Sequence, residues 1–578
     1  MSLSSARSDV APVDSFSDEK KASLEHEVSS PTSILYSTPP PKPKLPIAWQ
    51  AVMVFLTCMC TFGNHWSNGL IIALKTTIET NLNINNSEFA TLVAVTNLIN
   101  TFLCVGVGFV IDRFGGPLLS VVLAAFHFGG ALVQAGATTN HFDSYPLLVA
   151  GKVIAAVGDG SLDNAQHKIF TTYFAPGKGF AFSIGLIWAM ANLAQFTGQS
   201  TANVMSTDLG SYAWPLWISS VISLLSLLCA IGVFVLDKYL RSRYDVVDHS
   251  RRADKGGAPL ASVKKATFHW PAVRRLPLTF WMVVLFAIFE NAGVQAFVSI
   301  STQFAQQRLQ QGAVIGGWVS SFYLLLPVGL TPFLGVFIDA YGHRLTLLFM
   351  SGLLFMISML LLRLSGSVSA FIAAYVFYAL SQSFTPAPQV EIVRSIIPDP
   401  HYYGLAFAIK KSIVQASIVI IVTVAGKLQD ESPTSSLMNP VIMWLAYSAV
   451  SVLVSGGLLI ACYTKFGKRL LPAARLSQVR PRDLSAEVDK LWNSTRVMGV
   501  QSPIDLERTQ SEDGTGASLT NKHKEVILKS PLGTNTSLYS RWAAVVMGVM
   551  VVIIAWVIFG LGVEWGVHGN VIAGTVGT

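Results

Sequence analysis

Charged residues are scarce in this sequence. Asp, Glu, Lys and Arg make up 12% of its 578 residues, whereas 52% are hydrophobic, and the mean hydropathy is +0.51. That share of charge is about half of what a soluble domain has. A soluble globular protein is therefore excluded, and the sequence is that of an integral membrane protein.

Cysteine is also rare, and two further signatures are missing. All five cysteines lie inside apolar runs, which excludes a secreted disulfide framework and a zinc site. No Gly-x-x-x-x-Gly-Lys-Ser/Thr loop occurs, so a nucleotide-driven pump is not expected. Gly158-Asp159-Gly160 lacks the first glycine of an intramembrane aspartyl protease motif, because Ala156 stands there. We expect no enzyme activity, no cofactor and no metal. The cysteines are Cys58, Cys60, Cys104, Cys229 and Cys462.

Long apolar runs fill most of the chain. A membrane-spanning helix needs ~20 mostly apolar residues, and twelve such runs precede a thirteenth near 542–562. The predicted fold is an all-α membrane protein with two six-helix halves and a C-terminal thirteenth transmembrane helix. The twelve runs lie near 47–74, 88–111, 117–138, 145–171, 179–203, 214–236, 278–304, 313–338, 345–364, 368–393, 403–428 and 439–464.

The positions of Lys and Arg predict the orientation. The chain has 40 Lys and Arg residues against 32 Asp and Glu residues, which gives a net charge of +8. Most of the Lys and Arg residues stand in loops on one side, which is cytoplasmic by the positive-inside rule. Their place in loops argues against nucleic-acid binding. The predicted parts are a disordered cytoplasmic tail (1–46), an N-terminal half (47–236), a basic cytoplasmic loop (237–277), a C-terminal half (278–464), a disordered cytoplasmic linker (465–540), a thirteenth helix (541–562) and a non-cytoplasmic tail (563–578). Asn85 begins a glycosylation sequon in the first non-cytoplasmic loop.

A motif at the end of the second run returns in the second half of the chain. Gly108-Phe-Val-Ile-Asp112-Arg113-Phe-Gly115 and Gly335-Val-Phe-Ile-Asp339-Ala-Tyr-Gly342-His-Arg344 are 227 residues apart. Such a repeat in a hydrophobic chain indicates two homologous membrane halves. Glycine allows close approach of helices, and a charged residue can bind a neighbouring helix end. We therefore expect these residues to control the contact between the halves. The expected gating residues are Gly108, Asp112, Arg113, Gly115, Gly335, Asp339, Gly342 and Arg344.

Six plus six spans, a basic central loop and repeated Gly-x-x-x-Asp motifs resemble the major facilitator superfamily. Further stretches resemble its branch of major facilitator superfamily domain-containing protein 1, whose animal members resemble lysosomal dipeptide uniporters. These stretches are Thr61-Phe-Gly, Gly158-Asp-Gly-Ser-Leu162, Gly177-Lys-Gly and Leu236-Asp237. The resemblance implies alternating access, a peptide or amino-acid substrate, a vacuolar or lysosomal membrane (with the plasma membrane as the alternative) and a possible accessory membrane subunit.

The sequence departs from that branch at two positions. The resemblance implies an acidic residue in the fourth span and a basic one in the fifth, which hold the two ends of the peptide. The aligned residues here are Gly160 and Asn192. Three other functions stay open, namely a proton-coupled sugar transporter, a proton-coupled organic-anion transporter, and a non-transporting receptor or scaffold that acts through 465–540.

Polar residues inside the spans are costly, so each is a candidate site. In the fourth span Lys152, Asp159, Asp163 and His167 share one helical face, which indicates a substrate path, a proton path or a structural network. His127 in the third span is interpreted as structural. The candidate substrate-binding residues are Asn64, His65, Asp159, Asp163, Asn192, Gln195, Glu290, Asn291, Gln295, Gln382, Lys410 and Lys411.

Glu290 and the two adjacent lysines of the eleventh span give the most specific hypothesis. A peptide has an ammonium and a carboxylate, so its site needs an acid and a base. We expect Glu290 to bind the amine and Lys410, rather than Lys411, to bind the carboxylate. The alternative is a Glu290–Lys410 ion pair that only joins the two spans.

Overall fold

A computed structural model describes residues 43–139, 142–173, 180–246, 273, 276–364, 366–397, 403–432, 436–484, 486–487 and 538–569. From Lys44 onward the described residues belong to one compact unit. Most of the predicted tail 1–46, most of the loop 237–277, the middle of 465–540 and residues 570–578 lie outside the described residues.

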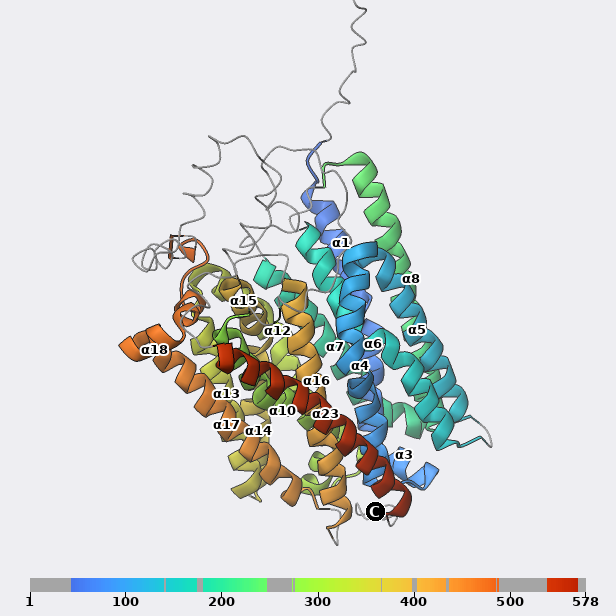
Figure 1. Cartoon of the computed structure of the whole chain (residues 1–578). Helices are drawn as coiled ribbons and strands as arrows, with labels where there is room; N and C mark the ends of the chain where they lie inside the picture. The colour runs from blue at the N-terminus through green and yellow to red at the C-terminus, as the bar shows by residue number, and fades with distance from the viewer. Residues whose placement is uncertain are drawn as a thin grey trace, which may run out of the picture. The chain divides into compact units, whose positions relative to one another are not determined.

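Most of the described residues lie in helices, as expected where backbone groups in lipid must be satisfied within one segment. Two groups of helices lie side by side (Figure 1). The N-terminal half consists of α1 (Ile47–Met59), α2 (Phe62–Ala73), α3 (Lys75–Leu82), α4 (Asn86–Phe114), α5 (Gly116–Ala137), α6 (Tyr145–Tyr173), α7 (Phe180–Asp208) and α8 (Ala213–Arg243). The C-terminal half consists of α10 (Leu278–Leu309), α11 (Ala313–Ser321), η2 (Phe322–Leu324), α12 (Leu325–Tyr341), α13 (Arg344–Leu364), α14 (Val368–Phe384), α15 (Pro386–Ile396), α16 (Tyr403–Asp430) and α17 (Met438–Tyr463).

Three predicted spans are broken into shorter helices. The first breaks between α1 and α2, where the Ser226 hydroxyl donates to Met59 O (3.0 Å) and accepts from Gly63 N (2.8 Å). A Cβ on Gly63 would lie 2.7 Å from the Ser223 Cα, so α8 can approach only a glycine there. The tenth span breaks before Pro386, which begins α15 because proline fits the first helical turn but not a helix interior. The eighth contains the short 3-10 segment η2.

Twelve described segments are long and apolar enough to cross a membrane, and they include the C-terminal one, Trp542–His568. The helix α7 is not among them, although the fifth span was predicted there. Its amides are buried against protein instead of lipid: Asn203 donates to Ala73 O (3.0 Å) and to Ala313 O (3.1 Å). This packing is the reason that a helix with so many polar residues can occupy a membrane position.

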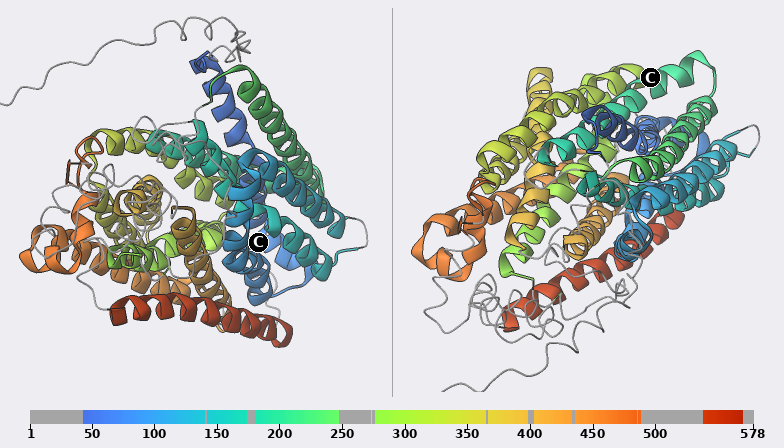
Figure 2. Two further views of the ribbon diagram at one scale, coloured as in Figure 1. Left: turned by 45° about the horizontal axis from the view of Figure 1, so that its top comes forward. Right: turned by 90° about the horizontal axis from the view of Figure 1, so that it is seen from above.

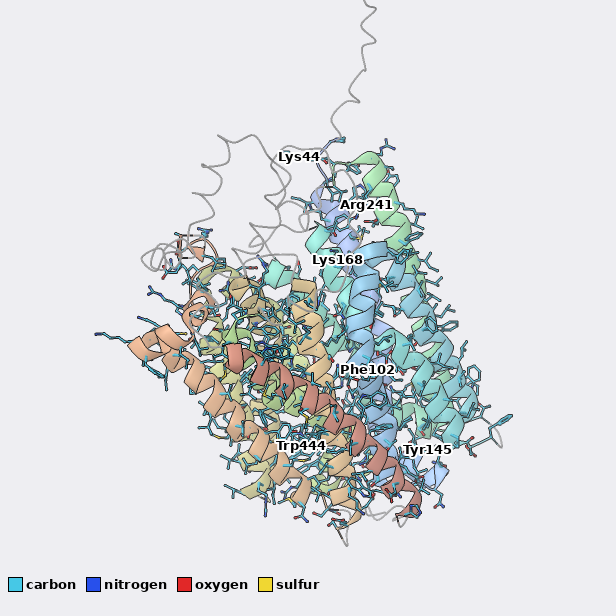
Figure 3. The ribbon with its side chains drawn as sticks, viewed as in Figure 1. Lys44, Phe102, Tyr145, Lys168, Arg241 and Trp444 are labelled. Atoms are coloured by element: carbon cyan, nitrogen blue, oxygen red, sulfur yellow. The ribbon has the colours of Figure 1, made fainter. Side chains whose placement is uncertain are left out.

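Two long interfaces join the halves, α4 against α16 and α7 against α12. The C-terminal helix α23 (Leu538–His568) packs on both α16 and α4, so it contacts both halves. It runs along one face of the molecule in all views (Figures 1 and 2). Lys44, Lys168 and Arg241 lie at one end of the bundle and Tyr145 lies toward the other (Figure 3), as the charge pattern predicts.

The residues after α17 correct one prediction. The sequence assigns 465–540 to a disordered linker, but its first part folds as α18 (Lys465–Leu470) and η4 (Pro472–Ser477). Ala473, Ala474 and Leu476 are fully buried in the same hydrophobic cluster as residues of α10 and α15. These three small or apolar residues pack into the core. The prediction missed them because it used the polar composition of the whole segment 465–540.

Candidate functional site

An ion pair connects the two halves through their interiors. Lys411 of α16 lies with its Nζ 3.0 Å from Asp163 Oδ2 of α6, and it donates to Gly160 O at 2.5 Å. His65 of α2 lies with its Nε2 3.9 Å from Asp163 Oδ1. The Lys411 and Asp163 side chains are 22% and 23% exposed. A base from one half thus meets an acid from the other, and both side chains are partly exposed.

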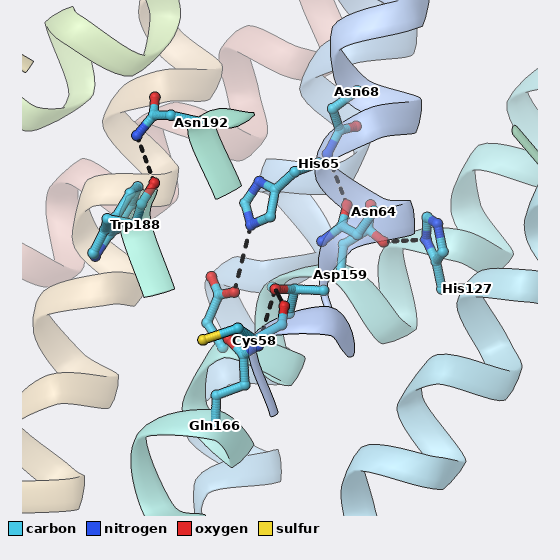
Figure 4. Close-up of polar contacts among 12 residues, drawn as sticks. Cys58, Asn64, His65, Asn68, His127, Asp159, Gln166, Trp188 and Asn192 are labelled. Atoms are coloured by element: carbon cyan, nitrogen blue, oxygen red, sulfur yellow. Dashed lines mark hydrogen bonds and ion pairs between the residues drawn. The ribbon is translucent and has the colours of Figure 1, made fainter. Parts of the chain in front are cut away.

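The polar face of α6 divides into two groups. Asp163 reaches α16, whereas Lys152 and Asp159 bind partners within the N-terminal half. Lys152 Nζ donates to Asn68 Oδ1 (2.8 Å), whose amide donates in turn to Asn64 Oδ1 (2.8 Å). Asp159 Oδ1 lies 2.5 Å from His127 Nδ1 (Figure 4). The residues that the sequence placed on one face of α6 therefore have partners on three different helices, α2, α5 and α16.

Glu290 lies in a separate polar cluster inside the C-terminal half. Its side chain is fully buried and accepts hydrogen bonds from Ser351, Thr385 (2.5 Å) and Gln389 (3.4 Å). Asn291 Nδ2 donates to Gln389 Oε1 (2.9 Å), and Gln295 donates to Asn291. Glu290, Asn291 and Gln295 are therefore joined through Gln389 to one another.

The Glu290–Lys410 ion pair, which was the alternative to a substrate site at these two residues, does not form. Among the described residues no ion pair links these two side chains, although Lys410 is buried with 8% exposure and lies near enough to interact electrostatically. The neighbouring Lys411 makes the ion pair with Asp163 instead. The sequence could not choose between adjacent lysines, since they point about 100° apart and the choice depends on where α16 meets α6.

A second polar contact between the halves is formed by amides. Gln382 Nε2 of α14 donates to Asn192 Oδ1 of α7 (3.1 Å), and Asn192 Nδ2 donates to Trp188 O (2.7 Å). Gln195, one turn further along α7, is half-buried, and its backbone carbonyl lies against Gly69. The two positions that depart from the resembling branch thus both contact the opposite half: Gly160 through Lys411 and Asn192 through Gln382.

The repeated motifs lie at the interfaces between the halves. A Cβ on Gly335 would lie 2.5 Å from Ala181 O, and one on Gly108 would lie 3.9 Å from the Ala408 Cβ. Asp339 Oδ2 accepts from Phe182 N (3.3 Å) in the first turn of α7. The carboxylate therefore lies at a helix N-terminus of the other half, where negative charge is favoured. The side chains of Asp112 and Arg113 lie outside the described residues.

The remaining residues that were expected to take part in gating lie in the turns that end the two motifs. Gly342 has φ +79°, and a Cβ there would lie 2.5 Å from Val479 O, so the segment after η4 packs directly on this turn. Arg344 is buried, with its guanidinium 3.6 Å from Glu391 and donating to Val479 O (3.2 Å). Gly115 has φ +90° at the turn between α4 and α5. Both turns need a glycine because an L side chain is strained at such φ values.

Replacing Asp339 should change the conformational balance rather than substrate affinity. Asp339→Ala removes a charged partner from the α7 N-terminus, an interaction of about 0.3–2 kcal/mol. We expect the rate of substrate exchange across the liposome membrane to change by about 2–30-fold, since 1.4 kcal/mol is a factor of ten. The KM for the substrate should stay the same. Kinetics of exchange at varied substrate concentration measure both quantities. A variant with normal rates and a raised KM would contradict this role.

A cluster at the opposite end was not predicted. Lys75 Nζ donates to Gln303 Oε1 (2.7 Å) and to Gln429 Oε1 (3.1 Å), and it lies 3.6 Å from Glu79. Burial raises the pKa of the Glu79 carboxyl to about 7. Asp430 of α16 accepts from Asn86 and Ser87 at the start of α4. The halves are thus bonded to each other at this end as well as near Asp339.

Asn85 has a structural role at this end. Its Oδ1 accepts from Glu88 N (2.8 Å) as the cap of α4, and its Nδ2 donates to Gly566 O of α23 (2.8 Å). The side chain is 2% exposed. A glycan at Asn85 would have to be attached before α23 packs there.

The predicted topology has a direct test. A tag after Thr578 should lie on the non-cytoplasmic side, together with Asn85, because α23 must cross the membrane once to bring Gly566 to Asn85. In vesicles with the cytoplasmic face outward, added protease should leave the tag intact. An oligosaccharide attached at Asn85 should be absent from the Asn85→Gln variant. A tag that is cleaved while Asn85 is protected would show that α23 does not cross.

The chain is similar in sequence and in fold to known proteins. Residues 57–316 match the Major Facilitator Superfamily model. The lysosomal dipeptide transporter MFSD1 of Homo sapiens is 23% identical over 394 residues, covering 66% of this chain and 81% of that protein. Its Danio rerio counterpart is 23% identical over 441 residues, covering 74% and 91%. The solved proton:xylose symporter XylE superposes with a TM-score of 0.53 at 14% identity, covering 72% of this chain and 95% of its own. The chain therefore has the major facilitator fold, and its sequence resembles the MFSD1 branch of that superfamily.

Proposed function

We propose that this chain is a secondary transporter of small polar organic solutes, with short peptides or amino acids as its substrates. The ion pair between Asp163 and Lys411 is the observation that supports it most directly. It joins the two halves with one acid and one base whose side chains are partly exposed. A zwitterionic solute can replace both partners, because its ammonium binds Asp163 and its carboxylate binds Lys411.

This arrangement also accounts for the two departures from the resembling branch. The fourth span has Gly160 instead of an acidic residue, and the fifth has Asn192 instead of a basic one. The acid is then Asp163, one turn after Gly160, and the base is Lys411, which binds the Gly160 carbonyl. His65 lies beside the same carboxylate and can donate a further hydrogen bond.

The transport cycle follows from the bonds at both ends of the molecule. A solute that separates Lys411 from Asp163 breaks a contact between the halves that lies between the two ends of the molecule. The halves then rock by releasing either the Lys75 cluster at one end or the Asp339 contact at the other. The relatives named lysosomal dipeptide transporters support a peptide substrate and a vacuolar or lysosomal membrane.

Counterflow in liposomes tests the proposal. Purified protein is reconstituted in vesicles preloaded with an unlabelled solute, and entry of the same labelled solute is measured for dialanine, alanine, xylose and uridine. We expect saturable entry of dialanine or alanine that empty vesicles lack. Entry of xylose alone would favour the sugar alternative, and no entry of any probe would favour a receptor or scaffold.

A further inference from the structure

Asn100 of α4 lies beside the Asp163–Lys411 pair, although the sequence pattern did not identify it as a candidate. A Cβ on Gly160 would lie 2.2 Å from both Cγ and Nδ2 of Asn100 and 2.4 Å from its Oδ1. The Asn100 amide therefore fills the space that a side chain at position 160 would need. The carbonyl of the same Gly160 accepts from Lys411 Nζ, so Asn100 packs against the residue that holds the lysine.

The carbonyl oxygen of the Asn100 amide has no partner. The residue is 1% exposed, and its Oδ1 is buried without a hydrogen bond among the described residues. An unpaired buried acceptor is unfavourable, and the large majority of such groups in proteins do have a partner. A missing partner at a contact between two halves that separate during transport indicates a donor that arrives with the ligand.

A second unpartnered amide oxygen lies close to Lys411 on α16. Gln415 is 8% exposed, and its Oε1 is likewise buried without a partner in the part of the chain that the structure describes. Each residue turns a helix by about 100°, so Gln415 points about 40° away from Lys411, toward the side of Ser412. Ser412 donates to Thr101 O, which places this part of α16 beside Asn100.

The carboxylate of Asp163 completes a set of three acceptors. Its Oδ2 binds Lys411, whereas its Oδ1 is buried without a hydrogen bond within the described residues, because His65 Nε2 lies 3.9 Å away. Acceptor oxygens that lack donors thus come from α4, α6 and α16 around one lysine. They match a ligand group with several N–H donors and a positive charge. A primary ammonium has three such donors, and its charge strengthens each hydrogen bond.

Other ligand groups fit these oxygens less well. A sugar hydroxyl donates only one hydrogen and has no charge for the Asp163 carboxylate to attract. A quaternary ammonium has the charge but no N–H, so its binding would leave all the acceptors unpaired. Water can serve the same oxygens between transport events, but a ligand that displaces it must replace its hydrogen bonds.

We propose that Asn100 and Gln415 determine the specificity of the substrate site, and that their amide oxygens, together with Asp163 Oδ1, select solutes that have an unsubstituted primary ammonium. This inference rests on the proposed function and deepens it, since it names the group by which the site distinguishes its substrates. The ammonium of the solute donates to the three oxygens, and its carboxylate binds Lys411. Recognition involves charge and hydrogen bonds only, and no covalent bond changes.

Competition against counterflow measures this preference. Liposomes with the full chain take up the labelled solute that the wild type transports, dialanine or alanine, in the presence of unlabelled competitors. The competitors are the same solute and its N-methyl and N,N,N-trimethyl forms, which keep both charges but have three, two and no N–H donors on the amine. We expect the loss of one donor to weaken competition by about tenfold or more, as for a hydrogen bond to a charged group, and the loss of all three to weaken it further.

Asn100→Leu separates hydrogen bonding from the bulk of the added methyl groups. Leucine has a similar size but no acceptor, so the unmodified solute should compete about tenfold less well. The trimethyl form should compete as it does with the wild type, because it has no N–H to lose. Gln415→Met should show the same change, and counterflow at saturating solute shows that each variant is folded.

Gln134→Met is a matched control. Gln134 of α5 is also buried with an unpartnered Oε1 in the described part of the chain. It lies against Gly151 of α6, however, about three turns before Asp163,. This variant should keep the preference of the wild type for the unmodified amine, since its amide lies away from the lysine.

The outcomes distinguish the inference from the function on which it rests. Equal competition by the three forms in the wild type would overturn the inference. An undiminished preference in both Asn100→Leu and Gln415→Met would also overturn it, because the methyl groups would then be excluded by bulk alone. Absence of dialanine and alanine counterflow in the wild type would refute the proposed function instead.

Discussion

Replacing Lys411 by methionine is expected to reduce counterflow of dialanine by about 100-fold or more. The substitution leaves Asp163 without its cationic partner, and a mostly buried carboxylate that lacks a counter-charge is unfavourable. It also removes the donor to the Gly160 carbonyl. Asp163→Asn should have a similar effect, because Lys411 then lacks its carboxylate. Uptake into liposomes and thermal unfolding of the purified proteins measure function and stability separately.

The double variant separates a substrate site from a structural contact. Asp163→Asn with Lys411→Met has no unpaired charge, so its thermal stability should return toward that of the wild type. Transport should not return, because neither end of a zwitterion finds a charged partner. Recovery of transport in the double variant would mean that the pair only joins the halves. Lys427→Met is a suitable control, since the side chains of the Lys427–Glu431 pair at the end of the same helix are 32% and 59% exposed, and pairs near the surface contribute about 0–1 kcal/mol.

A valine at Gly335 should abolish transport and lower thermal stability. The Cβ at this position would lie 2.5 Å from Ala181 O and 2.8 Å from the Ala181 carbonyl carbon and the Phe182 Cα. These are backbone atoms, so they cannot turn aside as a flexible side chain could. Overpacking of this kind costs about 1–3 kcal/mol or more. It would push α7 and α12 apart and displace Asp339 from the first turn of α7.

The same helix offers a matched control. Gly329→Val adds an identical side chain to α12 at a position where no atom lies within 4 Å of the new Cβ. Its uptake and unfolding temperature should stay near the wild-type values. Equal behaviour of the two variants would mean that α7 and α12 do not need to approach at Gly335 during transport. Gly185→Val, whose Cβ would lie 2.5 Å from Thr331 O, should behave like Gly335→Val.

The helices were predictable because a membrane-spanning helix needs a long apolar run. The internal repeat then divides the twelve runs into two halves of six. The breaks within spans were not predictable. Pro386 is visible in the sequence, but the break before Gly63 depends on a serine of α8 that lies 163 residues away. The apolar run at 179–203 predicted the helix α7, but it did not show that the polar residues of α7 are buried between helices. In both cases tertiary contacts decide what local composition leaves open.

The sequence offers candidate residues for the site but not the partners that each of them contacts. Helical periodicity identified Asp159 and Asp163 on one face of α6. It could not show that Asp159 binds His127, which was interpreted as structural, or that Asp163 binds Lys411 in preference to Lys410. Partners on different helices depend on how those helices pack, and periodicity describes only one helix at a time. The Lys75 cluster was missed because a single lysine beside a span gives no signal of its partners.

The position of α23 makes the thickness of the lipid bilayer a variable of the proposed transport cycle. With 31 residues the helix is about 46 Å long, whereas the hydrocarbon core is about 30 Å thick. It therefore crosses at a slant, with Gly548 against Ile413 of the C-terminal half and Gly566 against Glu88 of the N-terminal half. A thicker membrane draws such a helix upright, and a helix attached to both halves transmits that rotation to them. Lipid composition then acts on the same equilibrium as substrate.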